Sequence, residues 1–257
     1  MTTAKVALVT ASSAGLGAAC VKALAPHFRV VVNYYSRLEK AEEVIKEAGA
    51  IPALYELPTD TPRFIALQAD VADRKNIQNL VKETVDRMGR LDVIVSNAGW
   101  TRVTDFMDLD DQVVEEDWDR CFNVNVKSHL WLLYAAKPHF DANGEDGGSF
   151  VTVASLAGVR PSGSSVAYSV SKAAAIHLTK CLALVCGPNV RCNSVSPGLL
   201  MTEWGQRFSP DQIQSALDKT TTGRLATIED VADQVKTLAL SRSMTGQNIV
   251  LDGGIAI

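Results

Sequence analysis

Three residues whose side chains can hold or move a proton lie near one another in the sequence: Ser155, Tyr168 and Lys172. The run YSVSK (168–172) separates a phenol and an ammonium by four positions, and residues at that spacing lie on one face of a helix. Ser155 ends the apolar run SFVTVAS (149–155), which has the pattern of a strand. A tyrosine and a lysine that share one cleft are suited to proton transfer, because a nearby cation favours the phenolate. Taken singly, such residues are more often a surface pair and a turn serine.

Strands and helices must hold these side chains in place, and the sequence predicts that the two kinds of element alternate along the chain. KVALVTA (5–11) is a short β-branched run that ends in SSAGLG and is followed by apolar residues at helical spacing. The same pattern recurs with RVVVNYY and the helical run after it. Further strands are predicted at 63–71, 91–99, 149–155, 190–198 and 247–254. The alternation predicts an α/β fold with a doubly wound, Rossmann-type parallel sheet of about seven strands and helices on both faces.

No repeat, low-complexity segment or linker divides the chain, so we predict a single domain over residues 1–257. The segment IPALYELPTDTP (51–62) is a long helix-to-strand connection. Such a connection lies at the edge of the sheet opposite the ligand cleft, so we expect it to serve packing or partners rather than chemistry.

Composition excludes several classes of protein. The formal net charge is -4 and no dense basic run is present, which argues against a nucleic-acid partner. No apolar run approaches the ~20 residues of a membrane span, so no membrane partner and a cytoplasmic location are expected. The four histidines and five cysteines have no metal-ligand spacing, so no metal is expected. All five cysteines are interpreted as reduced, buried structural thiols.

The turn TASSAGLG (10–17) leads from the first strand directly into a helix, where unpaired N–H groups and the positive helix end can hold a dinucleotide pyrophosphate. A glycine turn can also serve the fold alone. The residues predicted to contact the cofactor here are Ser12, Ser13, Gly15, Leu16 and Gly17. Ala11 occupies the first position of the turn, and a positive φ would cost an alanine ~1 kcal/mol or more, so an ordinary negative φ is predicted for it.

The turn, SNAG (96–99), Ser155, YSVSK and PGLLMT (197–202) together resemble the short-chain dehydrogenase/reductase family, including its 3-oxoacyl-carrier-protein reductase-like and carbonyl reductase members. The match runs in register over nearly the whole chain. The family's first motif is TGxxxGxG, and this chain departs from it by carrying Ala11 in place of the first glycine. The combination is specific, although no single motif is.

The resemblance implies a catalytic role for four residues. Tyr168 would exchange the hydroxyl proton of the substrate, helped by Lys172, because an unperturbed phenol is a poor base at neutral pH. Ser155 would hydrogen-bond the carbonyl oxygen. Asn125 would interrupt a helix and hold a water that links the lysine to solvent, with Asn123 as the competing candidate.

The residues after the second strand bear on the cofactor. A carboxylate there would select NAD(H), but NYYSR (33–37) holds no acid, and Ser36 and Arg37 are suited to a 2′-phosphate. Ala14, where many NADP-preferring relatives carry a basic residue, is evidence on the other side, and Arg37 has the alternative of a solvated helix start. We predict NADP(H) in preference to NAD(H).

The resemblance also implies cofactor contacts at later strand ends. Tyr168 and Lys172 would contact the nicotinamide part in addition to their catalytic role. The other predicted contacts are Asp70 and Val71 beside the adenine, Asn97, Ala98 and Gly99 along the cofactor, Pro197 and Gly198 behind the nicotinamide, and Thr202 at its carboxamide.

Loops at 100–107, 156–166 and 199–222 follow strands and should surround the cleft. They carry apolar candidates for a substrate pocket, which are Trp100, Phe106, Val159, Met201, Trp204 and Phe208. They also carry arginines that either bind an acidic group of the substrate or remain solvated, which are Arg102, Arg160 and Arg207.

The predicted activity is NADP(H)-dependent reduction of a carbonyl on a small, apolar or aromatic molecule. Three alternatives stay open: an NAD-linked secondary-alcohol dehydrogenase, a 3-oxoacyl reductase, and a nucleotide-sensing regulator without turnover. Members of the family usually assemble as homotetramers or homodimers, and the apolar run HLWLLYAA (129–136) suits either an interface or a helix that faces the core.

Overall fold

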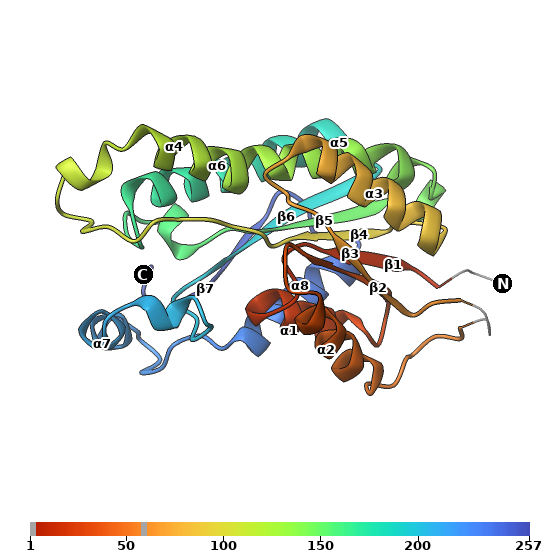
Figure 1. Ribbon diagram of the computed structural model, residues 1–257, viewed down its shortest axis with the longest axis horizontal. Coiled ribbons are helices and arrows are strands. Elements are labelled where there is room, and N and C mark those ends of the chain that lie inside the picture. Colours follow the sequence, from red (N-terminus) through yellow and green to blue (C-terminus); the bar gives the residue numbers. More distant parts are fainter. Residues whose placement is uncertain (1–3, 58–60) are drawn as a thin grey trace.

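The computed structural model describes residues 4–57 and 61–257, and it confirms the predicted parallel sheet between two layers of helices (Figure 1). The sheet has the order β3-β2-β1-β4-β5-β6-β7, and every neighbouring pair is parallel. The strands are β1 (Val6–Val9), β2 (Arg29–Tyr34), β3 (Phe64–Gln68), β4 (Val93–Ser96), β5 (Gly148–Val153), β6 (Val190–Pro197) and β7 (Asn248–Leu251).

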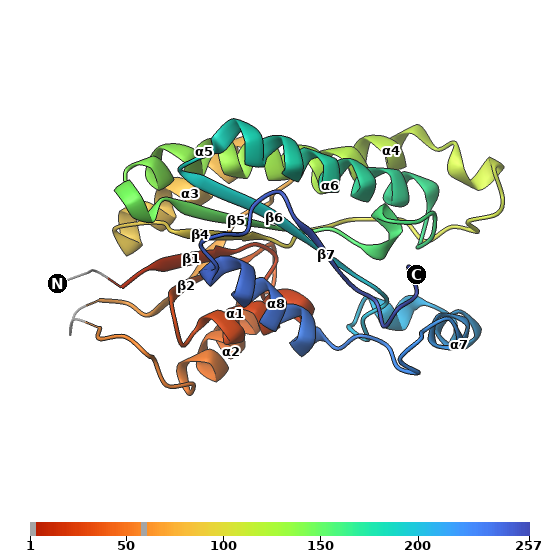
Figure 2. The same ribbon diagram turned by 180° about the vertical axis from the view of Figure 1, so that it is seen from behind.

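Helices cover both faces of the sheet, as Figures 1 and 2 show from opposite sides. One layer consists of α1 (Gly15–Leu24), α2 (Leu38–Gly49) and α8 (Ile228–Leu240). The other consists of α3 (Arg74–Met88), α4 (Glu115–Phe122), α5 (Ser128–Asp141) and α6 (Val166–Cys186). The short helix α7 (Pro210–Asp218) lies apart from both layers, beyond the carboxyl end of the sheet.

Strand periodicity accounts for the two cores. Successive side chains of a strand point to opposite faces, and central strands of a parallel sheet are buried on both. In β1, Ala7 and Val9 join the core under α1 and α8, whereas Val6 and Leu8 join the core under α3 and α5. The apolar run Val6–Val9 therefore becomes a central strand that is buried on both faces.

The strand order reverses between β1 and β4, because the chain runs outward through β2 and β3 before it returns to β4. Ligands of such sheets bind at this switch point, outside the carboxyl ends of the strands. The glycine turn follows β1 and SNAG spans the end of β4, so both predicted binding motifs lie there.

The described part of the segment 51–62 lies at the other edge of the sheet. Leu54 N donates to Pro26 O (2.8 Å) and Tyr55 Oη donates to Phe28 O (2.9 Å), just before β2 begins. This agrees with the predicted place away from the cleft; residues 58–60 lie outside the described part of the chain.

Among the described residues, α6 is the one helix long and apolar enough to meet the length and composition of a membrane span. It packs along β5 and β6 with nine buried residues, including Lys172 and Thr179. Its apolarity on that side is explained by the core of the fold.

Candidate active site

A cleft of about 850 Å³ opens at the carboxyl ends of the central strands. The predicted site residues that line it are Gly15, Leu16, Gly17, Arg37, Asn97, Gly99, Ser155, Tyr168, Lys172, Pro197, Gly198 and Thr202. Among the described residues, seven predicted ones lie outside its lining: Ser12, Ser13, Ser36, Asp70, Val71, Ala98 and Asn125.

Ser155 and Tyr168 are positioned by the starts of two helical segments. Ser155 follows β5, and its hydroxyl oxygen accepts a hydrogen bond from Ala157 N (3.1 Å). At the start of α6, the Ser165 hydroxyl accepts one from Tyr168 N (3.1 Å), as an N-cap residue does. The Ser155 hydroxyl lies close enough to Tyr168 to lower the pKa of the phenol as a hydrogen-bond partner. The strand end and the helix start thus bring the two hydroxyls together.

Lys172 lies one turn further along α6, on the same face as Tyr168. Its side chain is buried, and Nζ donates to Val153 O (2.8 Å) at the end of β5. Nζ lies 5.6 Å from the centre of the Tyr168 ring. Burial lowers the pKa of Lys172 to about 8, because the charged form is poorly solvated.

The protonation of Tyr168 differs from the simple expectation that Lys172 favours the phenolate. Burial raises the pKa of Tyr168 above its ordinary value, and the hydrogen bond with Ser155 only partly opposes this. The effect of burial on the Tyr168 hydroxyl therefore outweighs the stabilisation of a phenolate that the nearby Lys172 was expected to give. A phenol that keeps its proton at neutral pH is a proton donor, the role required for reducing a carbonyl.

Asn125 lies on the π-helical segment η2 (Asn123–Lys127), which joins α4 to α5. Its buried side chain accepts from Trp100 N (2.8 Å) and donates to Ser171 Oγ (2.9 Å) on α6. A Cβ on Gly99 would lie 3.4 Å from Lys172 Nζ and 3.6 Å from Asn125 Oδ1, so the three residues meet at one point. The structure brings Asn125 to the lysine, whereas Asn123 Nδ2 donates to Ala72 O (2.9 Å), away from it.

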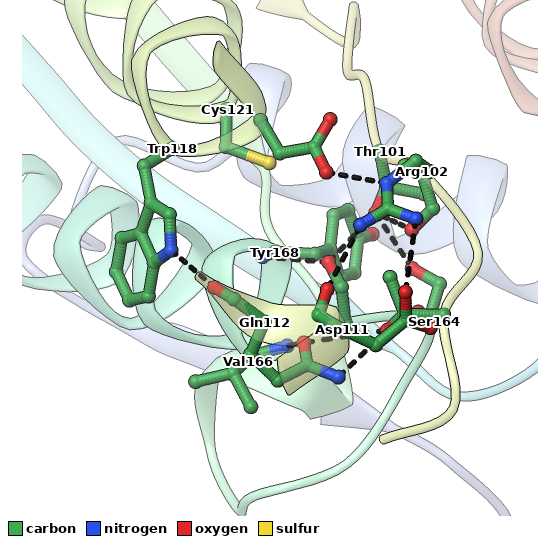
Figure 3. A network of polar contacts seen from close by, with 12 residues as sticks. Thr101, Arg102, Asp111, Gln112, Trp118, Cys121, Ser164, Val166 and Tyr168 are labelled. Carbon is green, nitrogen blue, oxygen red and sulfur yellow. Dashed lines mark hydrogen bonds and ion pairs between the residues drawn. The ribbon is translucent and has the colours of Figure 1, made fainter. Parts of the chain in front are cut away.

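Gln112, which the sequence analysis missed, supports the start of α6 from the facing loop (Figure 3). Its Oε1 accepts a hydrogen bond from Val166 N (3.0 Å), the first residue of α6, and its Nε2 donates to Thr104 Oγ1 (3.0 Å). Thr104 N in turn donates to Ser164 O (2.8 Å). Gln112 ends the 3-10 helix η1 (Asp110–Gln112) and is buried, but no pattern in the sequence marks that burial, so its role could not be predicted.

Arg102 belongs to the same network and is not directed at a substrate. Its guanidinium pairs with Asp117. It also pairs with Asp111 Oδ1 (3.3 Å), and Figure 3 shows these two residues side by side. Arg102 NH2 also donates to Asp111 O (2.8 Å). The ion pairs tie the loop after β4 to α4, and Arg102 is outside the lining of the cleft.

The conformation predicted for Ala11 is wrong: its φ is +48°. The contacts around it explain the left-handed backbone. Ala11 N donates to the buried Asn33 Oδ1 (3.0 Å), and Ala11 O accepts from Asn97 Nδ2 (3.2 Å). Two side chains from β2 and from the end of β4 thus hold the peptide groups on both sides of Ala11, and their hydrogen bonds offset a strain of roughly 1–2 kcal/mol.

The glycine turn fits a dinucleotide pyrophosphate. A Cβ on Gly17 would lie 2.5 Å from Ala11 O and 2.7 Å from Asn97 Nδ2, so only glycine allows the helix to start this close to the strand end. Gly15 has φ +55°. No side chain caps α1 at Ala14, which leaves the N–H groups of its first turn for an anion.

Several predicted cofactor residues brace this turn from within. Asn97 N and Ala98 N both donate to Thr10 Oγ1, at 2.9 and 3.2 Å. Ser12 is fully buried, and its hydroxyl donates to Val9 O (2.8 Å). These side chains shape the turn, and of them only Asn97 also lines the cleft.

The remaining predicted residues near the adenosine end differ in exposure. Val71 is buried, while Asp70 is half-buried and its Oδ1 accepts from Ala72 N (2.9 Å). Ser13 is half-buried and Ser36 is exposed. None of these four residues lines the cleft.

Arg37 lines the cleft and forms an ion pair that the sequence analysis missed. Arg37 NH1 lies 3.1 Å from Glu203 Oε2, and Lys40 Nζ lies 2.8 Å from Glu203 Oε1. The two cations belong to the start of α2, whereas Glu203 follows β6. A sequence separation of 166 residues between Arg37 and Glu203 left no local signal for this contact.

The loop after β6 lies directly on the glycine turn. Thr202 Cγ2 is 3.4 Å from the place that a Cβ on Gly15 would take. Pro197 ends β6, and a Cβ on Gly198 would lie 3.1 Å from Asp252 Cα, so Gly198 permits close packing against the end of β7. These placements suit residues that back and cover a bound cofactor.

Two of the six apolar loop candidates, Trp204 and Phe208, line the cleft; Trp100, Phe106, Val159 and Met201 are outside its lining among the described residues. Arg160 and Arg207 line it as well. Arg160 NH1 donates to Ile255 O (2.6 Å), and the Arg207 guanidinium lies 5.5 Å from the Trp204 ring centre.

Within residues 4–57 and 61–257, no group of histidine, cysteine or acidic side chains is arranged to hold a metal ion. His129 on α5 is buried, and its Nδ1 forms a 2.6 Å hydrogen bond with Ser96 Oγ. Burial lowers the pKa of His129 to about 3, so the ring is neutral at physiological pH. Its hydrogen bond to Ser96 supports the end of β4. Of the five cysteines, four are buried as expected, but Cys181 is exposed because it lies on the outer face of α6.

Comparisons with known proteins agree with this geometry. Residues 10–256 match the family model described as "Enoyl-(Acyl carrier protein) reductase". The chain is 39% identical to "Granaticin polyketide synthase putative ketoacyl reductase 2" of Streptomyces violaceoruber, over 98% of this chain and 96% of that protein.

Two solved structures are similar over almost their full lengths. A short chain dehydrogenase from Burkholderia cenocepacia in complex with NADP has a TM-score of 0.86 and 32% identity, covering 99% of this chain and 98% of that one. A 3-ketoacyl-(acyl-carrier-protein) reductase from Brucella melitensis complexed with NADH has a TM-score of 0.85 and 26% identity, covering 98% of both chains.

Proposed function

Because the chain belongs to the short-chain dehydrogenase/reductase family, whose members act on CH–OH and C=O groups, we propose that it reduces a ketone or related carbonyl with NADPH. The observation that carries the proposal is the meeting of Ser155, Tyr168 and Lys172 in the cleft that the glycine turn opens. A protein that only binds nucleotide has no need of a proton donor beside that turn.

The nicotinamide cofactor, when bound, supplies the hydride. In the proposed mechanism the Ser155 hydroxyl hydrogen-bonds the substrate carbonyl oxygen and orients it toward Tyr168. Tyr168, whose pKa is raised by burial, donates its proton to that oxygen. Lys172 and Asn125 hold positions from which Tyr168 can be reprotonated from solvent.

The N–H groups at the start of α1, Gly15 and Gly17 would hold the pyrophosphate, with Asn97 and Gly99 along the cofactor. Ser12, Ser13 and Leu16 belong to the same turn. Asp70 and Val71 would lie beside the adenine, Ala98 along the cofactor with Asn97 and Gly99, and Pro197, Gly198 and Thr202 on the nicotinamide side. NADP(H) is proposed over NAD(H) because Arg37 and Lys40 are cationic and lie after β2. The NADP complex of the Burkholderia relative supports this, and the NADH complex of the Brucella relative keeps the alternative open.

The proposed substrate is a small molecule with an apolar or aromatic part that packs on Trp204 and Phe208. A 3-oxoacyl chain is the second candidate, and it is favoured because the Streptomyces and Brucella relatives are named as ketoacyl reductases. Arg207, at the cleft beside Trp204, suits an anionic group on either substrate.

We also propose a homotetramer or homodimer that works in the cytoplasm. Exposed apolar residues on the outer face of α6, among them Val170, Leu184 and Val185, support an interface between copies.

The test combines binding and turnover in one variant. Tyr168→Phe should bind NADPH, followed by its fluorescence, within about twofold of the parent protein, because the hydroxyl contributes little to the whole cofactor interface. Its reductase activity on a panel of ketones and 3-oxoacyl thioesters should fall at least about a hundredfold, as expected when a proton donor is lost. Unchanged turnover would refute the mechanism, and NADPH binding without turnover in the parent protein would favour a nucleotide-sensing regulator.

A further inference from the structure

Glu203 reaches across the mouth of the cleft from the loop after β6 to the start of α2. Its two carboxylate oxygens are shared between two cations, with Arg37 NH1 at 3.1 Å and Lys40 Nζ at 2.8 Å. The hydrogen bonds from Lys40 and Arg37 lower the pKa of Glu203, so the carboxylate is ionised at neutral pH.

The ion pairs of Glu203 lie close to the glycine turn at the start of α1. Thr202, the residue before Glu203, lies against Gly15, where a pyrophosphate would meet α1. The segment after the second strand of such a fold then faces the adenosine ribose, and a carboxylate there favours NAD while cations favour NADP. This chain has the cations after β2, but its carboxylate comes from a loop that is distant in the sequence.

We propose that Glu203 is a specificity-determining residue that competes with the 2′-phosphate of NADP(H) for Arg37 and Lys40. The inference rests on the proposed function of this cleft. Binding of NADP(H) requires the phosphate to replace the Glu203 carboxylate on the two cations, whereas NAD(H), which lacks this phosphate, leaves the ion pairs in place.

The exposure of the partners makes the exchange feasible. The side chains of Arg37, Lys40 and Glu203 are 44, 38 and 61% exposed, and exposed ion pairs are weak and easily exchanged. A phosphate carries nearly two charges and three acceptor oxygens, so it is the stronger partner for a guanidinium and an ammonium. Glu203 therefore lowers the affinity for NADP(H) without preventing its binding.

The test measures dissociation constants by fluorescence titration for NADPH and NADH on the parent protein and on Glu203→Gln. The variant should bind NADPH about three- to tenfold more tightly, while NADH changes by less than about twofold. Measured by calorimetry, 2′,5′-ADP should also bind the Glu203→Gln variant more tightly than the parent protein, whereas the affinity for 5′-AMP should be unchanged. This difference would assign the effect to the 2′-phosphate. High salt should shrink the gain.

Two further variants provide controls. Glu42→Gln removes an exposed carboxylate from α2 outside this ion pair and should leave the NADPH to NADH ratio within about twofold of the parent. In the Arg37→Ala background, Glu203→Gln should increase NADPH affinity by a smaller factor than it does in the parent protein. The reason is that Arg37, one of the two cations for which Glu203 and the 2′-phosphate compete, is already absent.

The outcomes separate the inference from the function beneath it. Equal tightening of both dinucleotides, or no change in either, would overturn the role of Glu203 and leave the reductase proposal standing. Failure of the parent protein to bind either dinucleotide would overturn both.

Discussion

Lys172 and Tyr168, the proposed proton-transfer pair, have pKa values that burial shifts most strongly. Burial lowers the pKa of Lys172 to about 8 and raises that of Tyr168 above its ordinary value. At neutral pH the lysine is charged and the tyrosine is protonated, which is the state suited to carbonyl reduction. As pH rises, Lys172 loses its charge first.

This order predicts a pH profile. The kcat/KM for NADPH should be level near neutral pH and fall as pH rises through about 8, because that ratio reports groups of the protein before NADPH binds. The measurement is a series of initial rates between about pH 6 and about pH 10, taken at intervals of about one pH unit. A level profile throughout would contradict an essential Lys172 cation.

Linkage gives Lys172 an opposite effect on stability. Its folded-state pKa lies below the unfolded one, so the unfolded chain binds more protons between about pH 8 and the ordinary lysine value. The contribution of this residue therefore destabilises the fold at neutral pH and is relieved as pH rises. Burial of the charged Lys172 side chain thus lowers the free energy of unfolding at neutral pH.

Ala11 stores strain at the turn that starts α1. Replacing it with glycine removes roughly 1–2 kcal/mol of left-handed strain and adds roughly 0.5–1 kcal/mol of unfolded-state entropy. Ala11→Gly should thus raise Tm by about 1–2 °C, measured by calorimetry. The matched variant Ala14→Gly, at φ -161°, has no such strain and should not raise Tm. A drop of several degrees for Ala11→Gly would show that the Cβ contributes packing that outweighs the strain.

At the scale of elements, the sequence predicts what is local and misses what is not. Strands and helices follow from apolar periodicity, and the YSVSK spacing places Tyr168 and Lys172 on one face of α6. The backbone of Ala11 is set by Asn33 and Asn97, and tertiary contacts here override the local preference of alanine. Glu203 is missed for the same reason, because no local pattern links it to α2.

The start of α6 depends on a loop that lies outside the helix. Gln112 Oε1 satisfies Val166 N, one of the N–H groups that a helix leaves without a partner. Gln112→Ala should cost about 1–3 kcal/mol of unfolding free energy, because this buried donor loses its acceptor. It should also lower kcat more than it changes the dissociation constant of NADPH, since α6 carries Tyr168 while the glycine turn is remote.

Denaturant unfolding and single-variant kinetics test this prediction. Gln78→Ala, on the exposed face of α3, is the matched control and should change the unfolding free energy by less than about 0.5 kcal/mol. A Gln112→Ala protein that is destabilised but keeps its kcat would make Gln112 structural only.

At the scale of the molecule, α6 has two different faces. One packs on β5 and β6, and the other exposes Leu184 and Val185 at 85 and 76%, next to Cys181. Exposed apolar side chains gathered on one helix face are typical of an interface. The reactivity of the Cys181 thiol can therefore show whether another subunit covers this face of α6 in solution.

The proposed oligomer predicts linked changes in mass and thiol reactivity. Leu184→Glu should shift the protein to a smaller species in light scattering, because a carboxylate in an apolar interface is poorly solvated. Cys181 should react slowly with a thiol reagent in the parent protein and faster in this variant. The other four thiols should stay unreactive in both proteins, since burial raises the pKa of Cys20, Cys121, Cys186 and Cys192.

Leu54→Glu is the control variant. It changes a leucine of 73% exposure beside the end of α1 and should alter neither the mass of the particle nor the labelling of Cys181. A parent protein that is monomeric with a fast-reacting Cys181 would contradict an interface on α6.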